Sequence, residues 1–206
     1  MEYYNLSSNI IACDNFLPQQ KVDELYIDFL NNRKSFSTPS WSGDNKPDTQ
    51  EFYSSKCGGF DFWLPNKLEL DCPAIYSLSD WFMHQGLTAY AEKKNLQLFS
   101  LLRRKLEYDI HTICYNHDGY YNWHQDSGGR TILTFNLIFT KGNKLSGGDM
   151  LFMDGDKIIK VPNKNNFMVV FPSFIYHAIN PLKSEDNKDV DFTSQRFSVQ
   201  FWVRLS

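Results

Sequence analysis

The sequence has few cysteines and no long hydrophobic run, and both absences exclude classes of protein. Its four cysteines, Cys13, Cys57, Cys72 and Cys114, are scattered without a C-x-x-C pair. We therefore expect reduced thiols, with a structural zinc site as the minor alternative, rather than a disulfide framework. No segment approaches the roughly 20 apolar residues of a membrane span, and the N-terminus lacks a secretory signal. These features predict a cytoplasmic protein that does not act at a membrane.

Clustered positive charge is scarce as well. The chain has 21 Lys and Arg residues against 24 Asp and Glu residues, a formal net charge of -3. Proteins that bind nucleic acids need a basic surface to neutralise phosphates, so we expect no nucleic-acid partner. The one basic triplet, Arg103-Arg104-Lys105, is interpreted as a solvated strand edge rather than a binding patch.

What the chain does have is aromatic and apolar residues in quantity. Of its 206 residues, 42% are hydrophobic and 16% aromatic, with 17 Phe and 11 Tyr. This composition supports a buried core and favours β-structure, and the length suits a single domain. We expect residues 1–100 to form a helical and loop support and residues from about 101 to 206 to form the catalytic core.

The first hundred residues show two helical patterns. Residues 9–17 are expected to form a short strand that runs into a turn. After Pro18, apolar residues recur at three- and four-residue spacing and predict an amphipathic helix; they are Val22, Leu25, Tyr26, Phe29 and Leu30. A second helix is expected after Pro73 and extends toward Lys94. Between the two, residues 35–61 are expected to form a long loop that either covers a substrate or packs as an irregular segment.

From residue 106 onward the pattern changes to a period of two. Strands are predicted over 106–116, 131–139, 149–153, 157–161, 167–171 and 196–204. Two helices followed by many short strands favour a mostly β fold with flanking α-helices. The expected architecture is a double-sheet jelly roll with the two N-terminal helices packed on one sheet.

The segment around His124 and Asp126 suggests a metal site. Side chains two residues apart in an extended strand lie on the same face, so this imidazole and carboxylate can grip one cation. His177 follows the apolar strand 167–171, where a third ligand can be aimed inward. Two histidines and one carboxylate are the facial triad of non-heme Fe(II) oxygenases, which leaves positions open for a cosubstrate and O₂.

Arg196 opens the last predicted strand and offers a planar fork that pairs with a carboxylate. Ser198 lies on the same strand face, and Tyr115 on an earlier strand could donate to the same ligand. Because a buried arginine without a partner is costly, an inward-facing Arg196 implies an anionic ligand. Arg204 is the competing candidate and lies near the chain end.

In this order, the chain resembles the prolyl 4-hydroxylase-like branch of the Fe(II)/2-oxoglutarate-dependent dioxygenases. The resemblance is densest over residues 115–202. It rests on Phe16-Leu17, Tyr115, His124-Gln125-Asp126, Gly147-Gly148, Val161-Pro162, Phe171-Pro172-Ser173, His177, Arg196-Phe197-Ser198 and Trp202. It implies a double-stranded β-helix core with supporting N-terminal helices, and a hairpin turn at the glycine pair.

The resemblance also implies roles for individual residues. His124, Asp126 and His177 would bind Fe(II), and Arg196 would bind the distal carboxylate of 2-oxoglutarate, aided by Tyr115 and Ser198. Trp202 would line the active site. Two departures from the family pattern are the long segment between His177 and Arg196, read as a solvated loop insertion over 183–191, and an apolar residue, Leu137 or Ile138, where a tyrosine is common.

The expected function is therefore hydroxylation of a C–H bond coupled to decarboxylation of 2-oxoglutarate, with O₂ as oxidant and ascorbate as a reductant. A prolyl residue in a peptide or protein is the expected substrate, with a free amino acid or other small molecule as the alternative. Two other hypotheses are a non-catalytic jelly-roll binding module and a cupin-type enzyme that uses no 2-oxoglutarate.

The remaining histidines and aromatics receive smaller roles. Tyr121 and Trp123 flank the metal motif and are candidates for substrate contact, whereas His84, His111 and His117 are not expected to bind the metal. Arg130 is a candidate to pair with an acidic side chain near the site. The sequence leaves the oligomeric state open.

Overall fold

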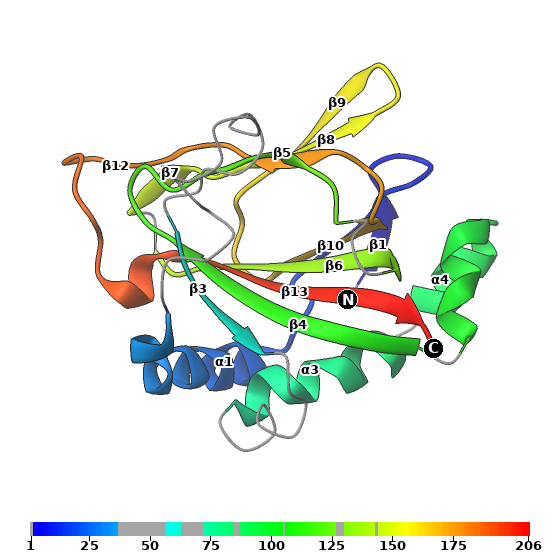
Figure 1. The fold of residues 1–206 in the computed structure, drawn as a ribbon, viewed down its shortest axis with the longest axis horizontal. Helices are drawn as coiled ribbons and strands as arrows, with labels where there is room; N and C mark the ends of the chain where they lie inside the picture. Colours follow the sequence, from blue (N-terminus) through cyan, green and yellow to red (C-terminus); the bar gives the residue numbers. More distant parts are fainter. Residues whose placement is uncertain are drawn as a thin grey trace.

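Two sheets face each other in the computed structural model, which describes residues 2–36, 57–62, 72–84, 87–104, 106–126, 130–142 and 144–206 (Figure 1). The larger sheet has seven strands in the order β1-β2-β10-β6-β13-β4-β3. Their bounds are β1 Glu2–Asn5, β2 Ile11–Asp14, β10 Phe167–Pro172, β6 Thr131–Thr140, β13 Arg196–Leu205, β4 Leu106–Tyr115 and β3 Cys57–Phe62. All of these strand pairs are antiparallel.

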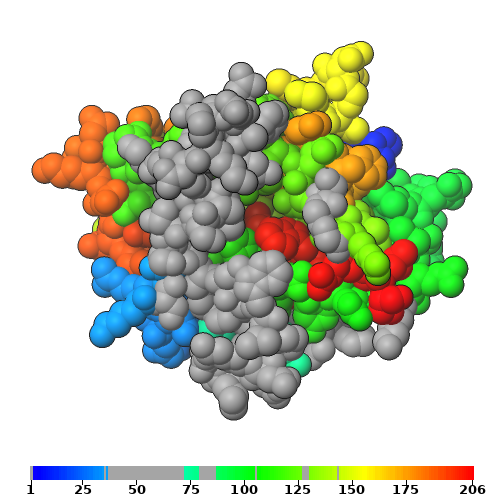
Figure 2. Space-filling model, viewed as in Figure 1, coloured from blue at the N-terminus to red at the C-terminus, as the bar shows by residue number. Residues whose placement is uncertain are grey.

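The smaller sheet has four strands in the order β5-β11-β8-β9 and lies across the other sheet (Figure 1). Its strands are β5 Tyr121–His124, β11 His177–Ile179, β8 Met150–Asp154 and β9 Lys157–Val161. A separate pair joins β7 Leu145–Gly147 to β12 Leu182–Ser184. The β8–β9 hairpin projects from the rest of the molecule (Figures 1 and 2). The two facing antiparallel sheets confirm the expected jelly-roll architecture.

The helices cover the face of the large sheet that points away from the small one. They are α1 Gln19–Asn31, α3 Pro73–His84 and α4 Leu87–Lys93, with 3₁₀ turns η1 Arg33–Ser35, η2 Gln97–Arg103 and η4 Phe192–Ser194. Figure 1 shows α1 and α3 side by side beneath the sheet, which confirms two N-terminal helices packed on one sheet. Among the described helices, none is both long and apolar enough to cross a membrane.

The periodicity of α1 explains where the helix packs. Val22, Leu25, Tyr26 and Phe29 are buried, as their three- and four-residue spacing predicts. Leu30 was expected on the same face but is 47% exposed. It directly follows Phe29, and the 100° rotation per residue carries it off the buried stripe.

A buried carboxylate joins the first helix to the next one. Asp28 of α1 accepts hydrogen bonds from the backbone N–H groups of Ala74 and Ile75, at 2.8 and 3.0 Å, in the first turn of α3. These N–H groups have no partner within their own helix, so Asp28 caps α3 from outside. Burial raises the pKa of Asp28, while the two N–H donors act in the opposite direction.

Alternation along β13 divides the interior into two cores. Phe197, Val199 and Phe201 pack with the helices in one buried cluster. The intervening residues, among them Arg196 and Ser198, face the small sheet, together with a second cluster that includes Ile113, Ile138 and Phe171. The large sheet is therefore buried on both sides, and its inner face, toward the small sheet, carries the polar residues.

The Gly147-Gly148 pair lies where the chain leaves β7 and runs toward β8. These two strands pair with β12 and β9 rather than with each other, so the expected hairpin turn at the glycine pair was wrong. Both glycines have positive φ, +75° and +71°. A Cβ atom on Gly147 would lie 2.3 Å from the backbone oxygen of Pro181. Only glycine permits both this left-handed conformation and this close approach between neighbouring strands.

Several expected boundaries were wrong. The helix expected from Pro73 toward Lys94 is two helices, α3 and α4. Residues 57–61, assigned to the long loop, belong to β3 and pair with β4, and residues 37–56 of that loop lie outside the described residues. Arg103 ends η2 and pairs with Glu92, so it does not lie at a strand edge, and Lys105 lies outside the described residues.

Other expectations agree with the structure. Cys13, Cys72 and Cys114 are buried and form no disulfide bonds among the described residues, while the side chain of Cys57 lies outside the described part. The insertion at 183–191 is mostly exposed, as expected for a solvated loop, although its first residues extend β12 and Ser184 is buried.

Candidate metal centre and active site

The structure brings His124, Asp126 and His177 together between the two sheets. His124 and His177 are direct register partners of β5 and β11. Asp126 lies just past the end of β5, where its backbone N–H donates to Ser173 at 2.9 Å. Within the described ranges these three residues form the one group able to hold a metal ion, with ligand atoms within 4.8 Å of one another.

The hydrogen bonds of the two imidazoles leave the metal-binding nitrogens free. His124 Nδ1 lies 2.8 Å from the carbonyl oxygen of Asn122, and His177 Nδ1 lies 3.0 Å from that of Ile175. A carbonyl only accepts, so each Nδ1 carries the proton and each Nε2 the lone pair. Both Nε2 atoms are buried without a hydrogen-bond partner in the described structure, which suits them to a cation.

Burial keeps His124 neutral. Desolvation is the largest cause that lowers the pKa of His124 to about 3, and the neighbouring His177 contributes in the same direction. The ring of Tyr121 stacks on that of His124 with centroids 3.8 Å apart, and Phe171 packs edge-on against His177 at 4.7 Å. These contacts hold both imidazoles in place for a metal ion.

Asp126 completes the cluster and is itself held by a neighbour. Its Oδ1 lies 3.6 Å from His124 Nε2, and its Oδ2 lies 3.5 Å from His177 Nε2. The hydroxyl of Thr134, in β6, donates a hydrogen bond to Oδ2 at 2.8 Å. Ligands on adjacent corners of an octahedron with bonds of about 2.1 Å lie roughly 3 Å apart, so the three residues need only a small contraction to hold such an ion.

Arg196 lies on the same inner face, toward the other end of β13. It is fully buried, and its Nη1 donates to Ser198 Oγ at 2.7 Å. Its Nε and Nη2 atoms have no hydrogen-bond partner among the described residues. Tyr115 is its register partner on β4, and the guanidinium carbon lies 5.2 Å from the centre of that ring.

The charge of Arg196 makes this end of the site suited to an anion. Burial lowers the pKa of Arg196 to about 10, so the guanidinium stays protonated at neutral pH. A buried cation without a paired carboxylate is costly. Tyr115, Arg196 and Ser198, which the sequence singled out, are thus brought together on the inner face of the large sheet.

The aromatic candidates are distributed over different places. Trp202 pairs in register with Thr134, and its ring centre is 5.3 Å from that of His111, so it stands at the level of the metal cluster. Figure 2 shows part of β13, coloured red, at the surface of the face in view. Tyr121 is buried against His124, so its ring supports one of the two imidazoles of the cluster.

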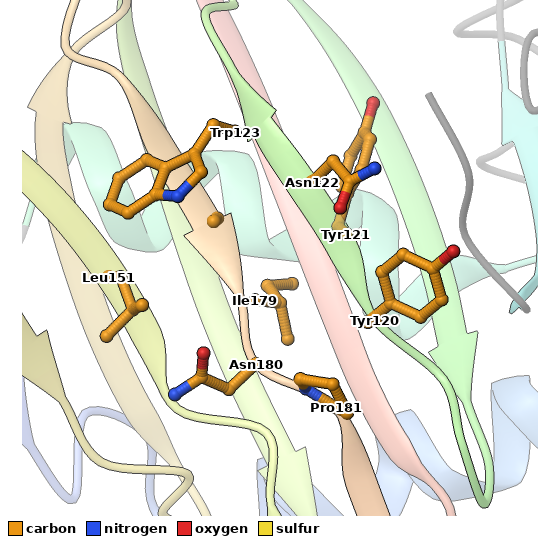
Figure 3. Close-up of a pocket in the computed structure, with 9 residues that line it drawn as sticks. Tyr120, Tyr121, Asn122, Trp123, Leu151, Ile179, Asn180 and Pro181 are labelled. Carbon is orange, nitrogen blue, oxygen red and sulfur yellow. The ribbon is translucent and has the colours of Figure 1, made fainter. Parts of the chain in front are cut away.

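Trp123 lines a hollow of about 260 Å³ over β5, β8 and β11 (Figure 3). Figure 3 shows its indole facing Leu151, with Asn180 and Pro181 below and Tyr120 opposite. None of the three residues of the metal cluster lines this hollow. The structure therefore gives Trp123 a setting distinct from that of Trp202.

The remaining charged candidates are not members of the metal cluster. Arg204 donates to Asp109 at 2.8 Å, and Arg130 is exposed. His117 lies in a turn, where it accepts a hydrogen bond from the backbone N–H of Ser184 at 3.1 Å. His111 and His117 are not part of the cluster, as expected, and the side chain of His84 lies outside the described part.

Sequence reasoning missed three polar residues on the inner face: Thr134, Asn136 and Gln200. All three are buried. The signal was present, because a polar residue at every second position of an otherwise apolar strand marks one face. What the pattern lacked was any indication that this face is enclosed by a second sheet.

The comparisons with known proteins agree with this geometry. Residues 110–204 match the model of the family described as "2OG-Fe(II) oxygenase superfamily". The matched residues include His124, Asp126, His177 and Arg196, which agrees with the resemblance to the Fe(II)/2-oxoglutarate-dependent dioxygenases. No curated protein sequence matches the chain.

Solved structures of this oxygenase fold are similar over almost the whole chain. A Trichoplax adhaerens prolyl hydroxylase, solved with a peptide fragment of a hypoxia-inducible factor, is 16% identical, with a TM-score of 0.65 and coverage of 96% of this chain and 84% of that one. A Pseudomonas putida prolyl-4-hydroxylase is also 16% identical, with a TM-score of 0.61 and coverage of 96% and 93%. At these identities the likeness shows the shared fold.

The residues present fit the groups that the oxygenase superfamily implies, namely Fe(II), 2-oxoglutarate and O₂. Two neutral imidazoles and a carboxylate with converging lone pairs suit Fe(II). The unpaired guanidinium nitrogens of Arg196 suit one carboxylate of a dicarboxylate.

Proposed function

We propose that this protein is an Fe(II)- and 2-oxoglutarate-dependent hydroxylase of C–H bonds, with a prolyl residue of a peptide or protein as substrate. The observation that carries the proposal is the buried His124, Asp126 and His177 cluster with Arg196 on the facing sheet. The match to the oxygenase superfamily supports the reaction type. The fold shared with prolyl hydroxylases supports the substrate class.

The protein groups have defined tasks in this reaction. His124, Asp126 and His177 would hold the iron on one side and leave the other side open. Arg196 would bind the distal carboxylate of 2-oxoglutarate, with Ser198 orienting its guanidinium and Tyr115 beside it. The aromatic packing around both imidazoles excludes water from the protein side of the metal site.

The bound iron and cosubstrate supply the oxidative chemistry: O₂, 2-oxoglutarate and the substrate C–H give CO₂, succinate and the C–OH product. Ascorbate would serve as the reductant that keeps the iron in its ferrous state.

Turnover without substrate tests the reaction type. The full chain incubated with Fe(II), ascorbate, 2-oxoglutarate and O₂ should form succinate slowly. A His124→Ala variant should lose at least about 100-fold of this activity, because it removes a metal ligand. His117→Ala is the matched control, since His117 lies outside the cluster, and should retain activity. Absence of both iron binding and succinate in the parent protein would contradict the proposal.

A screen of peptides and metabolites tests the substrate class separately. Proline-containing peptides should gain the mass of one oxygen atom and raise succinate formation above the uncoupled rate. Oxidation of a free amino acid with no reaction on any peptide would instead favour the small-molecule alternative. A non-catalytic binding module would show 2-oxoglutarate or metal binding without any succinate.

A further inference from the structure

A row of three polar side chains crosses the inner face between the metal cluster and Arg196. The strand registers place Asn136 of β6 opposite Gln200 of β13, and Gln200 opposite His111 of β4. The row lies two residues along β6 from Thr134, which holds Asp126. It is therefore next to the proposed metal site on the side toward Arg196.

Asn136 is the unusual member of this row. It is fully buried, and neither its Nδ2 nor its Oδ1 atom has a hydrogen-bond partner among the described residues. Gln200, in contrast, is engaged with His111. Burying an amide without partners is unfavourable, so the site is built for a ligand that supplies them.

The direction of the Asn136 side chain follows from its neighbours on β6. Thr134 reaches Asp126, and Ile138 belongs to the core between the two sheets. Residues at every second position of a strand share a face, so Asn136 points into the same space as the metal ligands.

The distance between the two unsatisfied groups suits a five-carbon dicarboxylate. Gln200 is the register partner of Asn136 and marks its level along β13. Arg196 and Gln200 are four residues apart, about 13 Å at 3.3 Å per residue. The Arg196 guanidinium spans the first half of this distance, because its Nη1 already reaches Ser198. About 7 Å remains, which is roughly the length of an extended 2-oxoglutarate between its outer oxygen atoms.

We propose that Asn136 donates a hydrogen bond from Nδ2 to the 2-oxo acid end of 2-oxoglutarate, while Arg196 binds the other carboxylate. The inference rests on the proposed function and adds the second contact that fixes the cosubstrate. An amide suits this position because it donates to a carboxylate without adding a charge beside the metal.

Calorimetry with Mn(II) in place of iron tests the contact without turnover. The full chain, Asn136→Leu and Arg196→Gln are each titrated with 2-oxoglutarate and with succinate, which lacks the 2-oxo acid end. Asn136→Leu should weaken 2-oxoglutarate binding about 10-fold or more, the effect of a lost hydrogen bond to a charged group, and change succinate binding less than about 3-fold. Arg196→Gln should weaken both ligands.

Unfolding measurements show whether Asn136→Leu changes the stability of the protein as well as its ligand binding. Because leucine is close in shape to asparagine and needs no partners, Asn136→Leu should unfold at the same or a higher temperature than the parent. If Asn136→Leu does not fold, Asn136→Ala takes its place in the titrations.

Equal 2-oxoglutarate affinity in parent and variant would overturn the role of Asn136 and leave the proposed function intact. Equal weakening of both ligands by Asn136→Leu would also overturn it, since it would indicate general support of the site. Failure of the parent to bind 2-oxoglutarate would overturn the proposed function together with this inference.

Discussion

The two faces of the large sheet are made by the same strands but are built for different purposes. Toward the helices, Phe197 of β13 stacks on Phe29 of α1 with ring centroids 4.3 Å apart. Toward the small sheet, the neighbouring Arg196 is fully buried and lacks partners for two of its nitrogens. One face therefore stabilises the fold, and the other holds polar groups at a cost in stability that a ligand offsets.

The largest expected effect comes from breaking the apolar face. Phe197→Ala removes a fully buried ring that also contacts Tyr26, Phe36 and Phe192. The free energy of unfolding should fall by about 3–5 kcal/mol, as is usual for buried Phe→Ala changes. Urea unfolding measures this loss. Phe174→Ala, at a 57% exposed position, is the control and should change stability by less than about 0.5 kcal/mol.

Removing a charge from the polar face should weaken metal binding without lowering the stability of the protein. Asp126→Ala should lower Mn(II) affinity at least about 100-fold, because a ligand is lost, yet leave the metal-free protein as stable as the parent or more so. Calorimetry and urea unfolding measure the two quantities. Asp191→Ala removes an exposed carboxylate paired with Lys144 and should affect neither. A large loss of metal-free stability in Asp126→Ala would show that the carboxylate is needed for folding.

Acid should weaken the polar face before the apolar one. Burial lowers the pKa of His111 to about 4 from its ordinary 6.5. Because the folded state favours the neutral ring, the contribution is complete above pH 6.5 and is lost as the pH falls toward 4. His111 alone should cost about 2 kcal/mol of unfolding free energy at pH 5 relative to pH 7.5. His111→Gln should show a shallower loss over this range, and an unchanged slope would contradict the assignment.

The smallest effect sharpens the comparison at a single hydrogen bond. Thr134→Val keeps the shape of the side chain but removes the hydroxyl that donates to Asp126. Metal affinity should fall about tenfold, as when a group supporting a ligand is lost. Titration with Mn(II) measures this change. Thr88→Val in α4, outside the sheets, is the control, and an equal loss there would point to a nonspecific effect.

Much of the fold was predictable because its signals are local. The spacing of Val22, Leu25 and Phe29 identified α1, and the alternation in 196–204 identified β13. β1 and β3 were missed. β3 contains two glycines and shows little alternation, so its pairing with β4 provides the structure that its own residues do not specify.

The site divides in the same way. His124, Asp126, His177 and Arg196 were identified from residue type, order and spacing, and the structure places them, with buried side chains, between the two sheets. Asn136 was missed because nothing in a sequence shows whether a polar group has partners. That depends on which strands lie beside it and on what covers them.

The sequence by itself determined the elements, the alternation of each strand and the chemistry of the metal-binding residues, because these depend on neighbours a few positions apart. Only the tertiary structure decided that β6, β13 and β4 lie side by side, which sets Arg196 and Asn136 at opposite ends of one polar face. Strand pairing joins residues far apart in the chain, and burial of their polar atoms follows from that pairing.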